Sequence, residues 1–221
     1  VQYAPDLAWL VFYEDKIFDE PLSNEDLSGS DYAVESVTSL SNIQKVLISL
    51  RSDRLKEQEL EAIVNGLNYL YPEATYSLAA LQESDLRVLQ KISGSIKSSE
   101  IIKLYELEDP LDKFELNQIF TDVDLALCMR FHAVLVAAAL CVPTAALAYD
   151  PKVEELGKQL SLPYLKLNEL SSDKNFIQFV QELESKIPSK KNLTESVAKM
   201  ADLTKKINSQ VIRNLVDELG E

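Results

Sequence analysis

Short apolar runs alternate with segments of helical periodicity along most of this chain, and this alternation constrains the fold more than any other feature. The run at 45–50 is followed by large aliphatic residues at helical spacing between 55 and 70, and the alternation recurs further along. Such alternation predicts an α/β fold built on a doubly wound parallel sheet. We expect strands at 45–50, 75–80, 101–105, 123–128, 144–148 and 164–167, and helices at 55–70, 83–92, 112–120, 131–140, 151–160 and 175–186.

The segments on either side of this alternating region differ from it in composition. Residues 1–41 begin with aromatic side chains and continue into an acidic, serine-rich stretch, which predicts an inter-domain segment or linker. Residues 42–188 form the predicted Rossmann-like domain. Residues 189–221 contain apolar positions three or four apart from Leu193 to Leu219, which predicts a long C-terminal amphipathic helix. A helix of this length is expected to pack across a domain face or against an oligomer partner.

Charge and cysteine content narrow the class of protein. The net charge of −14 argues against nucleic acid as a partner, because phosphate backbones require basic surface. Cys128 and Cys141 both lie in apolar surroundings, as reduced core cysteines do, which favours a cytoplasmic protein. No signal peptide is visible, and the most apolar stretch, 131–147, is interrupted by Pro143 before it reaches the length of a membrane span.

Several polar residues follow directly after predicted strands. Right-handed crossovers bring the carboxyl ends of parallel strands to one edge of the sheet, where ligands of α/β proteins bind. A guanidinium and an imidazole beside a helix N-terminus suit anion binding and proton transfer. The candidate site residues at this edge are Arg51, Gln82, Arg130, His132, Asp150 and Lys152.

Each candidate also has a structural explanation. His132, the single histidine, could be a hydrogen-bonded residue at a helix start, and Arg51 could pair with a surface acid. Asp150 could cap the helix that begins at Pro151, and Gln82 could be a loop residue, with Asp85 as a cap. Their predicted convergence on one edge favours a ligand site, because buried charged groups otherwise require an explanation.

Other chemistries lack the residues they need. One histidine and two core cysteines provide no zinc-binding set, so we expect no metal. The sequence contains no GxGxxG, no GxxxxGK[ST] and no GxSxG motif. No pair of carboxylates is singled out by its surroundings, which makes glycosidase chemistry a weak interpretation.

Five short segments resemble one known family. Met129-Arg-Phe-His-Ala133, then Val142-Pro143, then Ala148-Tyr-Asp-Pro-Lys-Val153 are similar to the (M/S)RLHA, GVP and (S/A)YDPKV segments of the polysaccharide pyruvyl transferases. Ile48-Ser-Leu-Arg51 resembles the family's SLR strand end, and Leu81-Gln-Glu-Ser-Asp85 its Q-x-S-D turn. The resemblance covers about 45–165 and corresponds to the C-terminal half of the family's GT-B-type fold.

The resemblance implies an activity and roles for residues. Members transfer a pyruvyl group from phosphoenolpyruvate to sugar hydroxyls and form a ketal. Arg51 and Arg130 would hold this donor, assisted by Lys152, because guanidinium groups bind phosphate and carboxylate well. His132 would act as the acid–base, and Asp150 would orient a cation or the acceptor. The donor would need no further cofactor.

The resemblance also implies partners. The acceptor would be a cell-surface polysaccharide or its precursor, either a free sugar or a lipid-linked saccharide, which would bring peripheral membrane association. A homo-oligomer or a missing N-terminal half would complete the acceptor site. The alternatives are a nucleotide-sugar glycosyltransferase domain of GT-B type, a catalytically silent binding subunit, and a structural partner held by the C-terminal helix.

The sequence departs from the family pattern in four places, one of which is that the proline common after the SLR segment is absent. Phe131 replaces the usual leucine, and Cys128 and Cys141 stand where glycine is usual. If the backbone at Cys141 has a positive φ, the side chain costs about 1 kcal/mol there.

Overall fold

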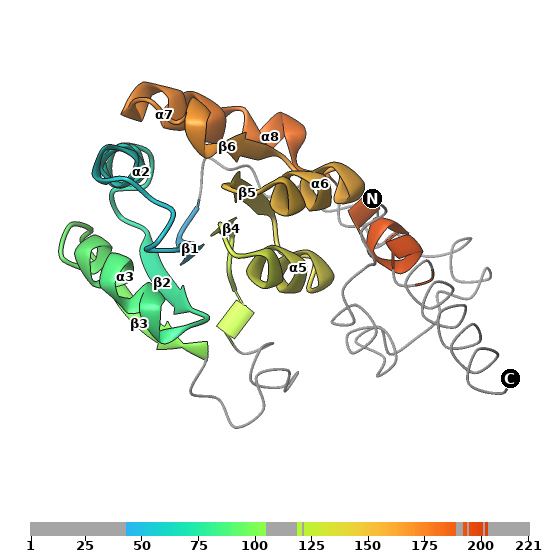
Figure 1. The fold of residues 1–221 in the computed structure, drawn as a ribbon, viewed down its shortest axis with the longest axis horizontal. Helices are drawn as coiled ribbons and strands as arrows, with labels where there is room; N and C mark the ends of the chain where they lie inside the picture. Colours follow the sequence, from blue (N-terminus) through green and yellow to red (C-terminus); the bar gives the residue numbers. More distant parts are fainter. Residues whose placement is uncertain are drawn as a thin grey trace, which may run out of the picture.

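In the part of the chain that the structure describes, a six-stranded sheet with every strand parallel to its neighbours forms the centre (Figure 1). The computed structural model describes residues 43–104, 119–120, 122–188, 192–193, 195–200 and 202. The strands are β1 (Lys45–Ser49), β2 (Thr75–Ala80), β3 (Ser99–Lys103), β4 (Leu125–Cys128), β5 (Thr144–Ala148) and β6 (Tyr164–Lys166). The helices are α2 (Glu57–Leu70), α3 (Leu86–Ser93), α5 (Phe131–Ala139), α6 (Pro151–Leu160), α7 (Asp173–Gln181) and α8 (Leu183–Lys186), with 3-10 turns η3 (Glu83–Asp85) and η5 (Leu167–Glu169).

The strand order is β3-β2-β1-β4-β5-β6, the order of a Rossmann fold. From β1 the chain first builds outward through β2 and β3, and then returns to add β4 on the other side of β1. The point between β1 and β4 is therefore the topological switch point. Register there pairs Ile48 with Leu127 and Ser49 with Cys128, so both strands end at the same level.

Alternating side chains of the strands form two apolar cores, one on each face. Val46, Ile48 and Leu78 point to the face that α2, α3 and α7 cover. Leu47 and Ala126 point to the opposite face, which α5 and α6 cover. Figure 1 shows the two groups of helices on opposite sides of the strands. The prediction of a doubly wound parallel sheet is confirmed.

Small residues let helices approach closely at two places. A Cβ added to Gly66 in α2 would lie 2.4 Å from Cδ1 of Phe176 in α7, and Phe176 is fully buried. A Cβ on Gly157 in α6 would lie 3.1 Å from the ring of Tyr164. The three glycines described, these two and Gly94, all have negative φ, so the two close contacts are explained by packing and not by backbone conformation.

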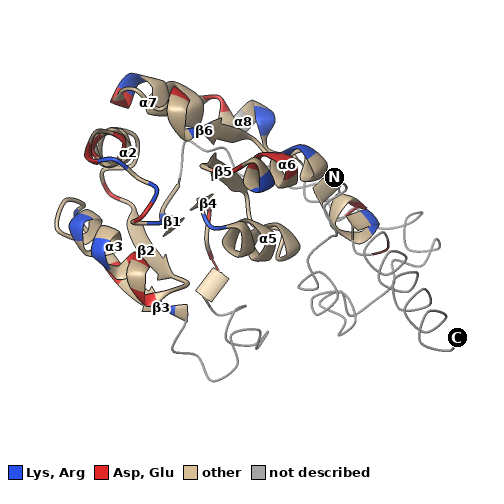
Figure 2. Ribbon diagram, in the orientation of Figure 1, with Lys and Arg blue, Asp and Glu red and all other residues tan. Residues whose placement is uncertain are grey.

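Helix α5 is buried on all sides rather than on one stripe. Every residue from Ala133 to Ala139 is buried, and Figure 2 shows the helix without charged residues beyond its beginning. A helix that is apolar all round needs cover on its outer side as well as the sheet beneath it. Leu193 and Val197, of the predicted C-terminal helix, belong to the same core as α5.

The predicted elements agree with the structure apart from their ends. The third strand begins two residues before its predicted start, at Ser99, and the first helix begins at Glu57 rather than 55. The predicted helices 83–92 and 175–186 are each divided, into η3 and α3 and into α7 and α8. Element ends depend on single caps and turns, which periodicity does not resolve.

Some predictions fall wholly or partly outside the described residues. The predicted segment 1–41 lies there, as does most of the predicted helix 112–120, of which 119–120 are helical. Of the predicted helix 193–219, the described residues are helical. None of the helices in the described part combines the length and apolar character that crossing a membrane requires.

The turn after α5 has the backbone conformation that its family-pattern glycine suggested. Cys141 has φ 56°, in the left-handed region, and its N–H donates to the carbonyl of Ala138. The N–H of Val142 donates to the carbonyl of Ala137, which closes the helix end in the manner of a Schellman motif. The predicted cost of the Cys141 side chain depended on a positive φ at this residue, and that positive φ is confirmed.

Candidate functional site

The candidate site lies at the carboxyl edge of the sheet, around the switch point between β1 and β4. Arg51 follows β1, whereas Arg130 and His132 follow β4, so the two arginines stand after neighbouring strands at this point. The backbone N–H of Arg51 donates to Sδ of Met129 over 3.4 Å, which ties the two loops together. In α/β folds of this order, the crevice at the switch point is where ligands bind.

Arg130 is held from one side by two residues that follow β2. Its Nε donates to Oδ2 of Asp85 over 3.1 Å and its Nη2 to Oδ1 of Asp85 over 2.5 Å. Nη2 also donates to Oε1 of Gln82 over 2.9 Å. The Asp85 side chain is fully buried and that of Arg130 is 10% exposed. Asp85 and Gln82 thus orient Arg130, and its Nη1 has no hydrogen-bond partner among the described residues.

Arg51 makes a similar bidentate pair in a more open place. Nε and Nη2 donate to the two carboxylate oxygens of Asp53 over 2.9 and 2.8 Å, and Nη1 donates to the Tyr149 hydroxyl over 2.8 Å. The guanidinium carbon lies 4.9 Å from the centre of the Tyr149 ring. Hydrogen bonding to Asp53 raises the pKa of Arg51 further above its usual value and lowers the pKa of Asp53. Both groups are therefore charged at neutral pH.

His132 stands in the first turn of α5 and is exposed. Its ring meets the Phe131 ring edge to face, with centroids 5.6 Å apart. Arg130 is the N-cap residue of α5 and makes no side-chain cap hydrogen bond. The first N–H groups of a helix attract anions when no side chain caps them. The imidazole of His132, the guanidinium of Arg130 and the N-terminus of α5 therefore belong to the same turn.

Asp150 performs the capping role that was one of its two interpretations. Its Oδ1 accepts a hydrogen bond of 2.7 Å from the backbone N–H of Lys152, and Pro151 occupies the first position of α6. Lys152 is exposed, and its side chain starts at the same edge after β5. Gln82 contacts Arg130 directly. Within the described part of the chain, neither Asp150 nor Lys152 makes an observed contact with Arg51 or Arg130.

Two residues of the site carried little signal in the sequence. Asp53 is two residues after Arg51, a spacing that permits the bidentate pair but is common on surfaces. Tyr149 is 98 positions from Arg51 and meets it only because β5 lies beside β4. Asp85 was expected to be a cap. Its carboxylate does accept from the backbone N–H of Gln82, over 3.2 Å, but it also neutralises Arg130.

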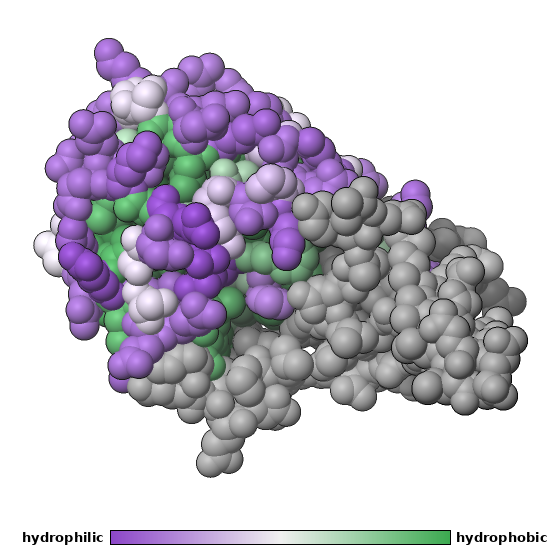
Figure 3. Space-filling model, in the orientation of Figure 1, coloured by the Kyte–Doolittle hydropathy of each residue, from purple (hydrophilic) through white to green (hydrophobic). Residues whose placement is uncertain are grey.

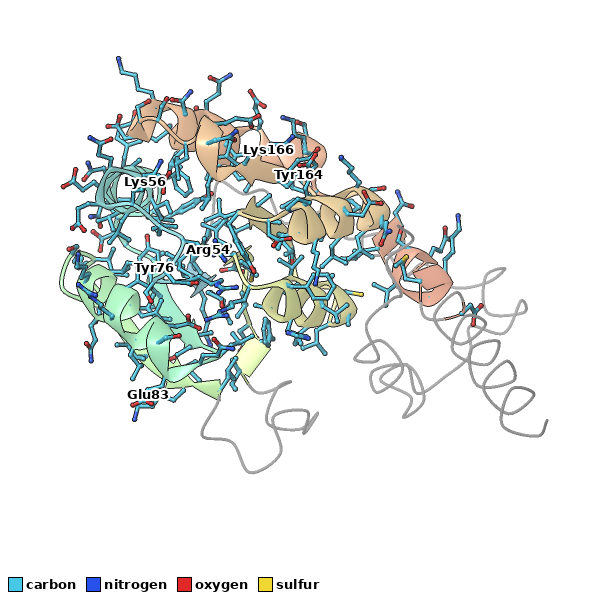
Figure 4. The ribbon with its side chains drawn as sticks, in the orientation of Figure 1. Arg54, Lys56, Tyr76, Glu83, Tyr164 and Lys166 are labelled. Atoms are coloured by element: carbon cyan, nitrogen blue, oxygen red, sulfur yellow. The ribbon has the colours of Figure 1, made fainter. Side chains whose placement is uncertain are left out.

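A group of strongly hydrophilic atoms lies near the middle of the coloured part of the viewed face (Figure 3), where Figure 4 labels Arg54. A cavity of about 1020 Å³ lies elsewhere, at the amino ends of the strands, and Lys45, Thr75 and Asp124 are among its lining residues. It contains none of the predicted site residues. No cluster of three histidine, cysteine or acidic residues suited to a metal ion occurs within the described ranges.

Comparisons with known proteins identify the fold. No model of a protein family matches the sequence, and no curated protein matches it. Among solved structures, a glycosyltransferase from Rickettsia africae ESF-5 is similar with TM-score 0.54 and 11% identity, over 79% of this chain and 48% of that one. A putative UDP-N-acetylglucosamine 2-epimerase from Listeria monocytogenes has TM-score 0.48 and 15% identity over 84% and 50% of the two chains. The chain thus spans about half the length of these structures. Its Rossmann-like sheet has the fold of the matched half of the Rickettsia glycosyltransferase.

Proposed function

We propose that this chain is the donor-binding half of a carbohydrate-modifying transferase, and that its donor is phosphoenolpyruvate. The observation that supports this most is the pair Arg51 and Arg130 at the switch point, next to the N-terminus of α5 and the exposed His132. Phosphoenolpyruvate carries a phosphate and a carboxylate, which suits two guanidinium groups. The segments containing these residues are also those that resemble the pyruvyl transferases.

The two arginines differ in how they could bind the donor. Arg130 keeps its Nε and Nη2 on Asp85 and Gln82, so it would offer Nη1 to one donor oxygen. Arg51 lies against the more exposed Asp53 and could exchange that carboxylate for a donor anion. The first-turn N–H groups of α5 would stabilise the remaining negative charge. Lys152 would approach from the neighbouring strand end.

His132 would then serve the transfer itself. As a cation it would donate a proton to the methylene carbon of phosphoenolpyruvate, so that C2 becomes electrophilic and one acceptor hydroxyl adds to it. Inorganic phosphate would leave with the electrons of its C–O bond, and a second hydroxyl would close the ketal. One hydroxyl proton would return to His132 and the other would leave with the phosphate.

The acceptor would bind largely outside this chain. A second Rossmann-like half, on this polypeptide or another, or a second copy of this chain, would supply most of the acceptor site. The acceptor would be a sugar or a lipid-linked saccharide in the cytoplasm, and in the second case the enzyme would associate peripherally with the membrane. Asp150, the N-cap residue of α6, would face the acceptor or a cation.

Isothermal titration calorimetry tests the donor. We expect the chain to bind phosphoenolpyruvate and not UDP-N-acetylglucosamine. In the complete enzyme, H132A should lower turnover at least about a hundredfold, as loss of a general acid does. Glu83→Gln, an exposed acid on the same edge, is the control and should leave turnover unchanged. Near-normal turnover of H132A, or absence of phosphoenolpyruvate binding, would contradict the proposal.

A second function has its own support in the fold comparison. The similar structure from Rickettsia africae is a glycosyltransferase, so transfer of a sugar from a nucleotide sugar is the alternative. The same arginines and the α5 N-terminus would then bind the diphosphate. Calorimetric binding of UDP and UDP-N-acetylglucosamine, without binding of phosphoenolpyruvate, would favour this function.

A further inference from the structure

The anion-binding edge of Arg51 is already occupied by a carboxylate of the same loop. Asp53 accepts from both Nε and Nη2, the side-by-side geometry that a ligand carboxylate or phosphate would adopt on a guanidinium. Tyr149 takes a hydrogen bond from the third nitrogen. A bidentate grip by this edge on a donor therefore requires Asp53 to move away.

The pair of Arg130 and Asp85 shows what a permanent arrangement looks like in this protein. There the acid is fully buried and also accepts from the backbone N–H of Gln82. Asp53, by contrast, has a side chain that is 51% exposed, and Arg51 is 21% exposed. Exposed ion pairs contribute little net stability, because water solvates the separated charges well. Asp53 can thus leave Arg51 at small cost, whereas Asp85 cannot leave Arg130.

A second guanidinium, that of Arg54, lies close enough to pair with the displaced carboxylate. Nε of Arg54 lies 3.5 Å from Oδ2 of Asp53, and the Arg54 side chain is 57% exposed. Its guanidinium carbon is 6.0 Å from the centre of the Tyr149 ring, on which Arg51 also lies. Two arginines of one short loop therefore lie at one aromatic ring, and both are within ion-pair distance of Asp53. Oδ2 of Asp53 is the atom nearest to both guanidinium groups, 2.8 Å from Nη2 of Arg51 and 3.5 Å from Nε of Arg54.

We propose that Asp53 is an internal substitute for the donor anion, and that it transfers from Arg51 to Arg54 when a phosphate- or carboxylate-bearing ligand binds. This inference rests on the proposed donor site at Arg51. It assigns ligand contact to Arg51 and a positioning role to Arg54. Asp53 neutralises the charge of Arg51 until a ligand binds. Only an anion that binds Arg51 more strongly than one carboxylate does would therefore displace Asp53.

The test is the affinity of the full chain for phosphoenolpyruvate and for inorganic phosphate, measured by calorimetry. Asp53→Asn removes the competing anion, so both ligands should bind about fivefold more tightly, which corresponds to about 1 kcal/mol. Glu83→Gln makes the same change in net charge on the same edge and should change affinity less than twofold. Affinity of D53N equal to or below that of the wild type would overturn the inference.

A double-mutant cycle tests the transfer to Arg54. In the wild-type background Arg54→Gln should weaken binding about threefold, because the displaced carboxylate loses its new partner. In the D53N background the same change should have no effect. An equal loss in both backgrounds would mean that Arg54 touches the ligand directly, and would overturn its positioning role.

The outcomes also separate this inference from the proposed function. Binding of phosphoenolpyruvate by the wild type, with no gain in D53N, rejects the substitution by Asp53 and leaves the donor site intact. Absence of binding in the wild type and in D53N rejects both. Binding of inorganic phosphate with the gain in D53N, but no binding of phosphoenolpyruvate, supports the inference and rejects that donor.

Discussion

Replacing Asp85 with asparagine should destabilise the protein severely, although the change alters only one atom. The Asp85 carboxylate accepts two hydrogen bonds from Arg130 and one from the backbone N–H of Gln82, and it is fully buried. An asparagine would point an NH2 group at one of these donors and leave the arginine without its counter-charge. Removing one partner of a buried pair costs about 3–5 kcal/mol. Because asparagine keeps the shape and one acceptor, we expect about 3 kcal/mol.

Urea denaturation followed by far-UV circular dichroism measures this loss. With a slope of about 2 kcal/mol per molar, the midpoint should fall by about 1.5 M. The control is D53N, because Asp53 makes the same bidentate contact to an arginine but is half exposed. It should cost no more than about 1 kcal/mol. If D85N and D53N differ by less than about 0.5 kcal/mol, burial does not determine the strength of these pairs and the reasoning is wrong.

Five further substitutions test the packing and the backbone. G66A should lower the free energy of unfolding by about 1–3 kcal/mol, because its Cβ would overlap a buried phenylalanine ring of α7. G94A should raise it by up to about 1 kcal/mol, because its Cβ would meet no atom closer than 3.6 Å. Thermal melts compare the two variants. S49A should be neutral or stabilising, since its buried Oγ has no hydrogen-bond partner among the residues that the structure describes. S77A should cost about 1 kcal/mol, because its Oγ donates a hydrogen bond to Glu100. A larger loss for S49A than for S77A in denaturant titrations would contradict this. C141G should stabilise the protein by roughly 0.5–1 kcal/mol. Glycine relieves the strain of the left-handed backbone, and this gain exceeds the loss from the greater conformational freedom of glycine in the unfolded chain. A melting temperature below that of the wild type would refute this prediction.

Most of the sheet could be predicted from local patterns. The apolar run before Arg51 and the one before Met129 are buried strands, as their composition indicated, and Pro151 begins a helix as expected. These patterns are local because the alternation of side chains follows from the backbone geometry of each element. The ends were less well predicted. The first helix begins at Glu57, where the side chain of Glu59 caps the backbone N–H of Lys56.

The candidate site was predicted as a set of residues but not as a set of contacts. Arg51 and Arg130 were both expected at the carboxyl edge, and both lie there. Their partners were not foreseen as partners, because Asp85 is 45 positions and Tyr149 98 positions away in sequence. Periodicity has no information on contacts over such separations. The roles of these residues in donor binding remain predictions for the experiments above.

The sequence by itself determined which segments become strands and helices, and which charged residues stand at the ends of the strands. Hydrophobic spacing and turn residues are enough for that, because each element buries its own apolar face. Only the tertiary structure decided that β1 lies beside β4, and therefore that Arg51 and Arg130 follow neighbouring strands at the switch point. It also decided that one arginine has a buried counter-ion and the other an exposed one. The strength and mobility of an ion pair depend on its exposure to water, which long-range packing sets and local sequence does not.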